Sequence, residues 1–74
     1  MEEANIYYDP EEKAVVIENS EAVSVELLIG DQLIADVPIL QDGTGKATNV
    51  EIVTPGDLII VKEHFERVIT LEEK

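Results

Sequence analysis

The stretch that most constrains this chain is a turn followed by four consecutive apolar residues. Thr54-Pro55-Gly56-Asp57 combines a residue with a preset φ, a residue that tolerates positive φ and a residue that hydrogen-bonds its own backbone. Leu58–Val61 follows as Leu-Ile-Ile-Val, which is the composition of a strand covered on both faces. Such a strand belongs near the centre of a sheet, so the sequence predicts an all-β domain.

The rest of the chain repeats this pattern of short apolar segments. Alternation is clearest from Val23 to Ile29, where Val, Val, Leu and Ile occupy every second position. We predict seven strands in one domain of residues 1–74: Ala4–Tyr8, Ala14–Glu18, Val23–Ile29, Gln32–Val37, Ala47–Val53, Leu58–Lys62 and Phe65–Leu71. In the second of these strands, Val15 and Ile17 are expected to face inward.

Turn-forming residues separate these segments. Asp9-Pro10 opens a charged turn that runs to Lys13, and Gly30-Asp31 has the composition of a two-residue hairpin turn. Pro38 has no N–H for a ladder and therefore belongs to an edge or a bulge. Gln41–Lys46 contains two glycines and is the longest predicted loop, which predicts the most mobile segment.

Two segments also admit a helix. Residues 20–36 are apolar enough for one, but stiff Val and Ile side chains and Gly30-Asp31 in the middle favour strands. In residues 63–74, Phe65, Val68 and Ile69 have helical i, i+3, i+4 spacing, whereas short connections and β-branched content favour a strand. Both alternatives stay open at the level of the sequence.

The composition limits the possible partners. Seventeen acidic and five basic residues give a net charge of −12, so nucleic acid and anionic membranes are not expected partners. The acidity predicts a solubilising surface, with a surface for cations or a basic partner as the alternative. Cysteine is absent, which excludes disulfides and thiolate metal sites. No apolar run approaches the ~20 residues of a membrane span, and Met1-Glu2-Glu3 lacks the basic start of a signal peptide, so we expect a soluble protein.

Several segments carry a family resemblance: Ile6–Pro10, Val15–Asn19, Val23–Leu27 and Pro55–Leu58. They resemble the C-terminal sorting domains of the bacterial type IX secretion system. Those domains open with Ile-Tyr-Pro-Asn-Pro, run at this spacing into a Leu-x-Ile-Glu-Asn strand, and later carry a Pro-x-Gly-x-Tyr turn. The resemblance covers nearly the whole chain. It implies a seven-stranded, immunoglobulin-like antiparallel β-sandwich, and a secreted or cell-surface location if the family's role is retained.

Few residues suit catalysis. His64 is the single histidine, and its expected turn position beside Glu63 favours a solvated side chain over a functional one. No Ser, His and Asp stand at a workable spacing. Gly43–Lys46 resembles the end of a phosphate loop, but Ala47 replaces the Ser or Thr that would hold Mg²⁺. A plain loop is therefore favoured.

Two groups of carboxylates are candidates for Ca²⁺: Asp9, Glu11 and Glu12, and Asp36 with Asp42. Neither group has the spacing of a calcium-binding loop, which favours a solvated acidic face. Tyr7 and Tyr8 should point to opposite faces of their strand, with one ring packed inward.

Local sequence rules are followed along the whole chain, with turn residues in the turns and β-branched residues in the strands. Functional sites usually break such rules, and consistency of this kind is typical of designed domains. We therefore predict a non-enzymatic small β-sandwich, a designed or redesigned scaffold, with no catalytic, cofactor-binding or metal-binding residues and no cofactor. The alternative is a secretion-sorting or adhesion-type module that is normally fused to a cargo protein.

The central apolar strand predicts one partner. Either Leu58 and Ile60 or Ile59 and Val61 must face away from the core, and off-phase apolar residues of other strands enlarge that surface. These off-phase residues are Val16, Leu28, Val53 and Val68. Two structures can cover such a face, either the Pro38–Asn49 segment or a second copy of the chain. The polar, glycine-rich middle of the segment favours the second copy, so a weak homodimer through an apolar sheet face is expected.

Overall fold

The computed structural model describes residues 4–48 and 53–74, and all regular structure within them is strand. The strands are β1 (Asn5–Asp9), β2 (Ala14–Glu18), β3 (Ser24–Ile29), β4 (Gln32–Pro38), β5 (Gly45–Thr48), β6 (Leu58–Lys62), β7 (Glu66–Thr70) and β8 (Glu72–Glu73). The all-β prediction is confirmed. The helix alternatives for residues 20–36 and 63–74 are wrong, since both regions form strands and hairpins.

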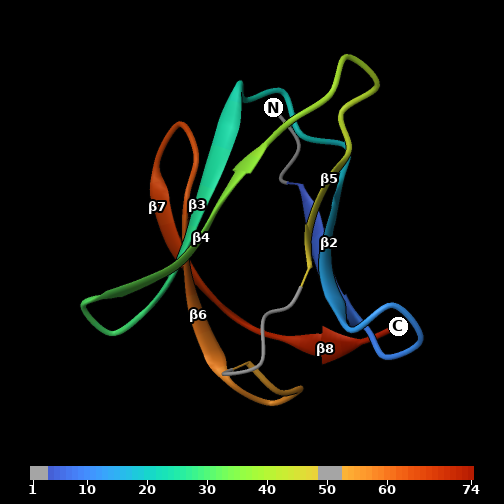
Figure 1. Cartoon of the computed structure of the whole chain (residues 1–74). Coiled ribbons are helices and arrows are strands. Elements are labelled where there is room, and N and C mark those ends of the chain that lie inside the picture. The colour runs from blue at the N-terminus through green and yellow to red at the C-terminus, as the bar shows by residue number, and fades with distance from the viewer. Residues whose placement is uncertain (1–3, 49–52) are drawn as a thin grey trace.

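The strands form two four-stranded sheets that pack together as a β-sandwich (Figure 1). Sheet A has the order β5-β2-β1-β8, and sheet B has the order β4-β3-β6-β7. Neighbouring strands are antiparallel except β1 and β8, which are parallel. The described residues thus contain eight strands, where seven antiparallel ones were predicted. The additional strand β8 is too short and polar to leave a sequence pattern, and it gains its partner by crossing back to β1.

The core lies between the sheets and is aliphatic. Its fully buried side chains come from both sheets: Val15, Ile17, Val25, Leu27, Val37, Ile59, Val61 and Leu71. Val15 and Ile17 face inward as predicted, and Tyr8 packs against the core from β1. Burying each such aliphatic side chain contributes about 1.5–3 kcal/mol, so this interface is the main source of stability.

Strand β6 lies between β3 and β7, which confirms its predicted central place. The structure also shows which of the four consecutive apolar residues of β6 face the core and which face outward, a choice that the sequence leaves open. Ile59 and Val61 are buried, whereas Leu58 is 63% exposed and Ile60 is half-buried. Leu58 and Ile60 therefore form the outward pair.

The turn before β6 has the geometry that its residues predict. Gly56 has a φ of +100°, and the Asp57 amide donates to the Thr54 carbonyl at 3.1 Å. The same turn holds the crossing from β7 to β8: the Gly56 amide donates to the Leu71 carbonyl at 2.7 Å, and the Leu71 amide donates to the Asp57 carbonyl at 2.8 Å. The turn thereby fixes the buried Leu71 side chain between the sheets.

Four local predictions need correction. Val23 precedes β3 and is 88% exposed, because the polar loop from residue 19 enters the sheet only at Ser24. Strand β5 begins at Gly45, inside the predicted loop, because Gly45–Thr48 pairs with β2. Phe65 lies in the β6–β7 bend and is 61% exposed. Val53, expected among the outward-facing apolar residues, is only 2% exposed and belongs to the core, because it follows no strand alternation at its position before the Thr54–Asp57 turn. Residues 49–52 of the predicted Ala47–Val53 strand lie outside the described residues.

Hairpin β3–β4 agrees with its prediction. Ile29 pairs with Gln32 across the two-residue turn Gly30-Asp31, and Gly30 has a φ of +58°. A bulge follows between Leu27 and Leu28, where the register on β4 shifts by one residue. Pro38 is the last residue of β4, an edge strand, as expected from its missing N–H.

Candidate functional site

Two loops at one end of the sandwich enclose an open hollow of about 460 Å³. One loop spans residues 19–23 between β2 and β3, and the other spans residues 39–44 between β4 and β5. Positive φ values at Asn19 (+66°) and Gly43 (+86°) turn the two backbones toward each other. The Ser20 amide then donates to the Gly43 carbonyl at 2.9 Å, so the loops form one unit.

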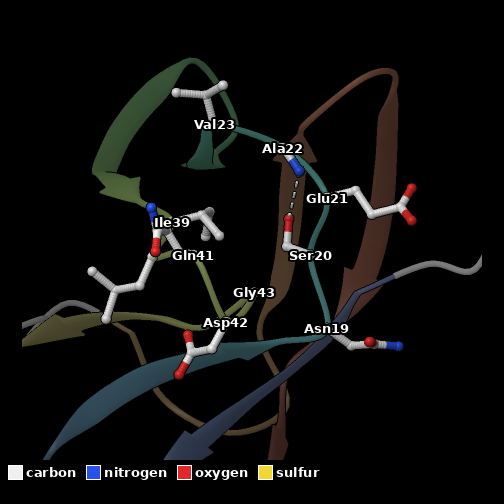
Figure 2. A pocket seen from close by; sticks show the side chains of 10 residues that line it. Asn19, Ser20, Glu21, Ala22, Val23, Ile39, Gln41, Asp42 and Gly43 are labelled. Atoms are coloured by element: carbon white, nitrogen blue, oxygen red, sulfur yellow. Dashed lines mark hydrogen bonds between the residues drawn. The ribbon is translucent and has the colours of Figure 1, made fainter.

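The walls of this hollow are aliphatic and polar. Val23 is 88% exposed and Leu40 is 65% exposed. Figure 2 shows the side chains of Ile39, Gln41 and Asp42 on one side of the residue 19–23 loop. The side chains of Asn19 and Glu21 point to the other side of that loop. A second open hollow of about 490 Å³ shares Leu40 and is lined by Val16, Pro38, Thr44, Gly45 and Lys46.

Asp42 holds its own loop together. Its Oδ1 accepts hydrogen bonds from the Thr44 hydroxyl at 2.7 Å and from the Thr44 amide at 3.1 Å. The hydroxyl and then the amide lower the pKa of Asp42 below its ordinary value, because both donors stabilise the carboxylate. The turns of the predicted longest loop are therefore hydrogen-bonded, and the Leu40 amide also donates to the Thr44 carbonyl at 2.8 Å.

A charged group lies beneath the first loop. The Arg67 guanidinium on β7 donates from Nη2 to Glu63 Oε1 at 3.2 Å and to the Ala4 carbonyl at 2.9 Å. Glu63 Oε2 accepts from the Ser20 hydroxyl at 3.3 Å, and this hydroxyl oxygen accepts from the Ala22 amide at 3.2 Å (Figure 2). The charged side chains are only 18% and 12% exposed. We call Ser20, Glu63 and Arg67 the loop anchor, because they tie residues 19–23 to the β6–β7 hairpin.

The sequence did not indicate the loop anchor. Ser20 is separated from Glu63 and Arg67 by more than forty residues, and none of the three belongs to a recognisable motif. The one available signal is the four-residue spacing of Glu63 and Arg67 on either side of a short bend. That spacing suggests an ion pair but not its position under a distant loop.

The carboxylates considered for Ca²⁺ are dispersed. Asp9 is buried and accepts from the Glu11 amide at 3.0 Å, while Glu12 binds Lys46 Nζ at 2.7 Å. Asp36 lies on β4, whereas Asp42 lies in the loop after β4 and accepts hydrogen bonds from Thr44. Over residues 4–48 and 53–74, no three His, Cys, Asp or Glu side chains are grouped to hold a metal ion.

The remaining predicted residues have structural positions. His64 is exposed in the β6–β7 bend. Gly45 and Lys46 belong to β5, and the hydrogen bond to Glu12 raises the pKa of Lys46. Tyr7 points away from the core and donates to Glu18 at 3.1 Å. Partial dehydration and then the bond to Glu18 raise the pKa of Tyr7. The opposite orientation of Tyr7 and Tyr8 is confirmed.

Comparisons with family models, curated proteins and solved structures found no match to this chain. In the part of the chain that the structure describes, no helix is long and apolar enough to span a membrane.

Proposed function

We propose that this chain is a non-enzymatic, immunoglobulin-like β-sandwich of designed or redesigned sequence that serves as a scaffold. The observation that carries the proposal is that polar groups around the loop hollow form hydrogen bonds within the protein. Asp42 is engaged by Thr44, and Ser20 is engaged by Glu63 and Ala22. Catalytic groups instead need a free acceptor or donor aimed at the substrate. Here the polar side chains hold the loops in place.

The strand order supports the immunoglobulin-like assignment. In immunoglobulin domains the second strand pairs with the fifth, and the third strand pairs with the sixth in the opposite sheet. The pairs β2–β5 and β3–β6 follow this scheme, and β4 lies beside β3 as the additional strand of variable-type domains does. Cysteine and tryptophan are absent from the sequence, so aliphatic side chains replace the disulfide and indole that form the centre of antibody domains.

Local consistency supports a designed or redesigned sequence. Glycines occupy positive-φ positions in three turns, and the hairpin turn Gly30-Asp31 has the shortest usual length. Within the described residues, no buried side-chain polar atom lacks a hydrogen-bond partner. Few unsatisfied groups and matched turn chemistry are the properties that designed sequences are selected for.

The alternative proposal is a secretion-sorting module of the type IX system. Its support is the position of the residues that carry the resemblance. Asp9-Pro10 opens the β1–β2 turn, Asn19 follows β2 with positive φ, and Pro55-Gly56 forms the turn before β6. These are the turns that the family's sequence pattern requires.

An export assay separates the two proposals. The chain is fused behind a signal peptide and a fluorescent cargo in a bacterium with a type IX system, beside a known sorting domain as positive control. The scaffold proposal predicts that the cargo stays in the periplasm. The scaffold proposal would be overturned if the wild-type chain exports the cargo and the Pro55→Ala, Gly56→Ala variant does not. The variant must retain the native β-type circular dichroism spectrum.

The non-enzymatic part has its own test. Purified protein is incubated with chromogenic ester, phosphate, glycoside and peptide substrates beside Ser20→Ala and Asp42→Asn. We expect no difference between the three proteins in any turnover. A substrate whose hydrolysis disappears in one folded variant would contradict the proposal.

A further inference from the structure

The contact between the two loops of the hollow brings together two dipeptides that can react with themselves. Asn19-Ser20 and Asp42-Gly43 lie far apart in the sequence, and the Ser20 amide donates to the Gly43 carbonyl at 2.9 Å. In an Asn or Asp residue, the backbone nitrogen of the following residue can attack the carbonyl carbon of the side chain and close a succinimide ring. A small following residue leaves that nitrogen accessible, and glycine also adopts the backbone conformation of the ring most readily.

The chain has these two dipeptides as its most reactive ones. Gly follows an aspartate only at position 42, and Ser follows an asparagine only at position 19. The other Asn and Asp residues precede proline, which has no N–H, or a long or branched side chain that crowds the nitrogen: Asn5, Asp9, Asp31, Asp36, Asn49 and Asp57.

In the folded loop, ring closure at Asp42 is opposed at both reacting atoms. The nucleophile is the Gly43 nitrogen, whose N–H donates to the Leu40 carbonyl at 3.0 Å. The electrophile is the Asp42 carboxyl carbon, and Oδ1 of that group accepts from the Thr44 hydroxyl at 2.7 Å and from the Thr44 amide at 3.1 Å. These bonds stabilise the carboxylate and lower the pKa of Asp42. Ring closure instead consumes the neutral carboxyl group, which can lose its hydroxyl as water.

The loop protects Asp42 by hydrogen bonds and not by burial. Both Asp42 and Asn19 are exposed, and their side chains point away from the sandwich (Figure 2). Surface loops open locally at a free energy well below that of global unfolding. Opening of residues 39–44 breaks the bonds from Thr44 and Gly43 together, so the reaction is expected to proceed from the locally opened loop.

We propose that Asp42 is a modification site of this chain, at which the opened loop converts aspartate to isoaspartate. The Gly43 nitrogen attacks Cγ of Asp42 and loses its proton, and the carboxyl group loses its hydroxyl, so one water molecule leaves as the ring closes. A water molecule then adds to the backbone carbonyl carbon of residue 42 and breaks its bond to the Gly43 nitrogen. The amide now runs through Cγ, and the former backbone carbonyl is a free carboxylate. Water is the sole co-reactant, and the mass of the chain is unchanged.

The product is expected to separate the two loops. Isoaspartate routes the main chain through Cβ and Cγ, which adds one carbon–carbon bond of about 1.5 Å before Gly43. The backbone bonds between Leu40, Gly43 and Thr44 depend on the native spacing, so the Gly43 carbonyl moves away from the Ser20 amide. That amide nitrogen is the nucleophile for Asn19. Its release should speed deamidation of Asn19, in which the ring closes with loss of ammonia. The conversion is independent of whether the chain serves as a scaffold or as a sorting module.

Peptide mapping by mass spectrometry, after long incubation of the folded chain at neutral pH, tests the site. We expect isoaspartate at Asp42 before any other position. Thr44→Val removes the hydroxyl donor and should speed the conversion about tenfold, because the loop opens more often. Ile59→Val is the control, since it weakens the core but leaves the loop bonds in place. It should react at nearly the wild-type rate.

Several results would overturn the proposal. One is isoaspartate that forms first at another aspartate. Another is equal acceleration by Thr44→Val and Ile59→Val, which would show that the reaction needs global unfolding. A third is a folded Thr44→Val chain that stays unmodified while the urea-unfolded chain is converted.

A second incubation tests the link between the loops. Protein isomerised at Asp42 is separated by ion-exchange chromatography and incubated again beside unmodified protein. Deamidation of Asn19, seen as the gain of one negative charge, should be faster in the isomerised protein. Equal rates would overturn the proposed separation of the loops.

Discussion

Gly45 of β5 lies directly against Val37 of β4, at the corner where the chain passes from sheet B to sheet A. A Cβ on Gly45 would come within 2.8 Å of Val37 Cγ1, and equally close to Ile39 Cδ1. The Pro38 carbonyl would be 3.1 Å away. Only the absence of a side chain lets the two sheets approach this closely at the corner.

Replacing Gly45 therefore should destabilise the fold through overpacking. Gly45→Ala is expected to lower the free energy of unfolding by about 1–3 kcal/mol, because backbone and branched side chains surround the added methyl group. Urea unfolding followed by circular dichroism measures this loss. Thr48→Ala on the exposed part of β5 is the control and should cost less than about 0.5 kcal/mol. Equal losses would show that Gly45 is not a close contact.

The loop anchor predicts a second difference between variants. Arg67→Met leaves the nearly buried Glu63 carboxylate without its cation, so we expect a loss of about 2–3 kcal/mol in unfolding free energy. Lys62→Met breaks the exposed pair with Glu66, whose side chains are 46% and 61% exposed. That control should cost at most about 1 kcal/mol. A loss for Arg67→Met no greater than the control would contradict the structural role of the anchor.

Strain at one turn residue predicts a stabilising change. Lys13 has a φ of +53° in the β1–β2 turn, and a side chain in this region costs roughly 1–2 kcal/mol. Lys13→Gly removes the strain and loses about 0.5–1 kcal/mol through the freedom of unfolded glycine. We expect a net gain of up to about 1 kcal/mol. Lys13→Ala keeps the strain and removes the same charge, so a matching gain there would refute the explanation.

The Asp42–Thr44 contact predicts a pH dependence. The folded pKa of Asp42 lies below its unfolded value near 3.8. Its contribution is therefore fully present above that value and is lost as pH falls through the folded pKa. Thr44→Val removes the hydroxyl donor, so the difference in stability from wild type should shrink below about pH 4. Thr70→Val serves as control. A difference that is constant from pH 7 to pH 2.5 would exclude this origin.

The predictable parts of the fold were those with local patterns. Alternation of apolar residues predicted strand β3, and the turn-forming residues predicted the turns at Gly30-Asp31 and Thr54–Asp57. Leu58–Val61 predicted a central strand but not its direction, because four consecutive apolar residues alternate equally well in either phase. Register with β3 and β7 supplies the missing information.

Non-local contacts account for the errors. Strand β8 consists of two glutamates whose only cue is the distant pairing with Tyr7 and Tyr8. The loop anchor brings Ser20 to Glu63, a contact that no sequence spacing encodes. Of the candidate site, the sequence predicted a loop at residues 41–46. It did not predict that this loop would be hydrogen-bonded to the loop of residues 19–23 through Ser20 and Gly43.

The central structural claim is that β3 pairs with β6 in one sheet while β2 pairs with β5 in the other. Nuclear Overhauser effects between backbone protons measure it most directly. The structure predicts contacts between Leu28 and Ile60 and between Val16 and Lys46. Absence of both contacts, together with sequential i, i+3 contacts through residues 20–36, would contradict the β-sandwich.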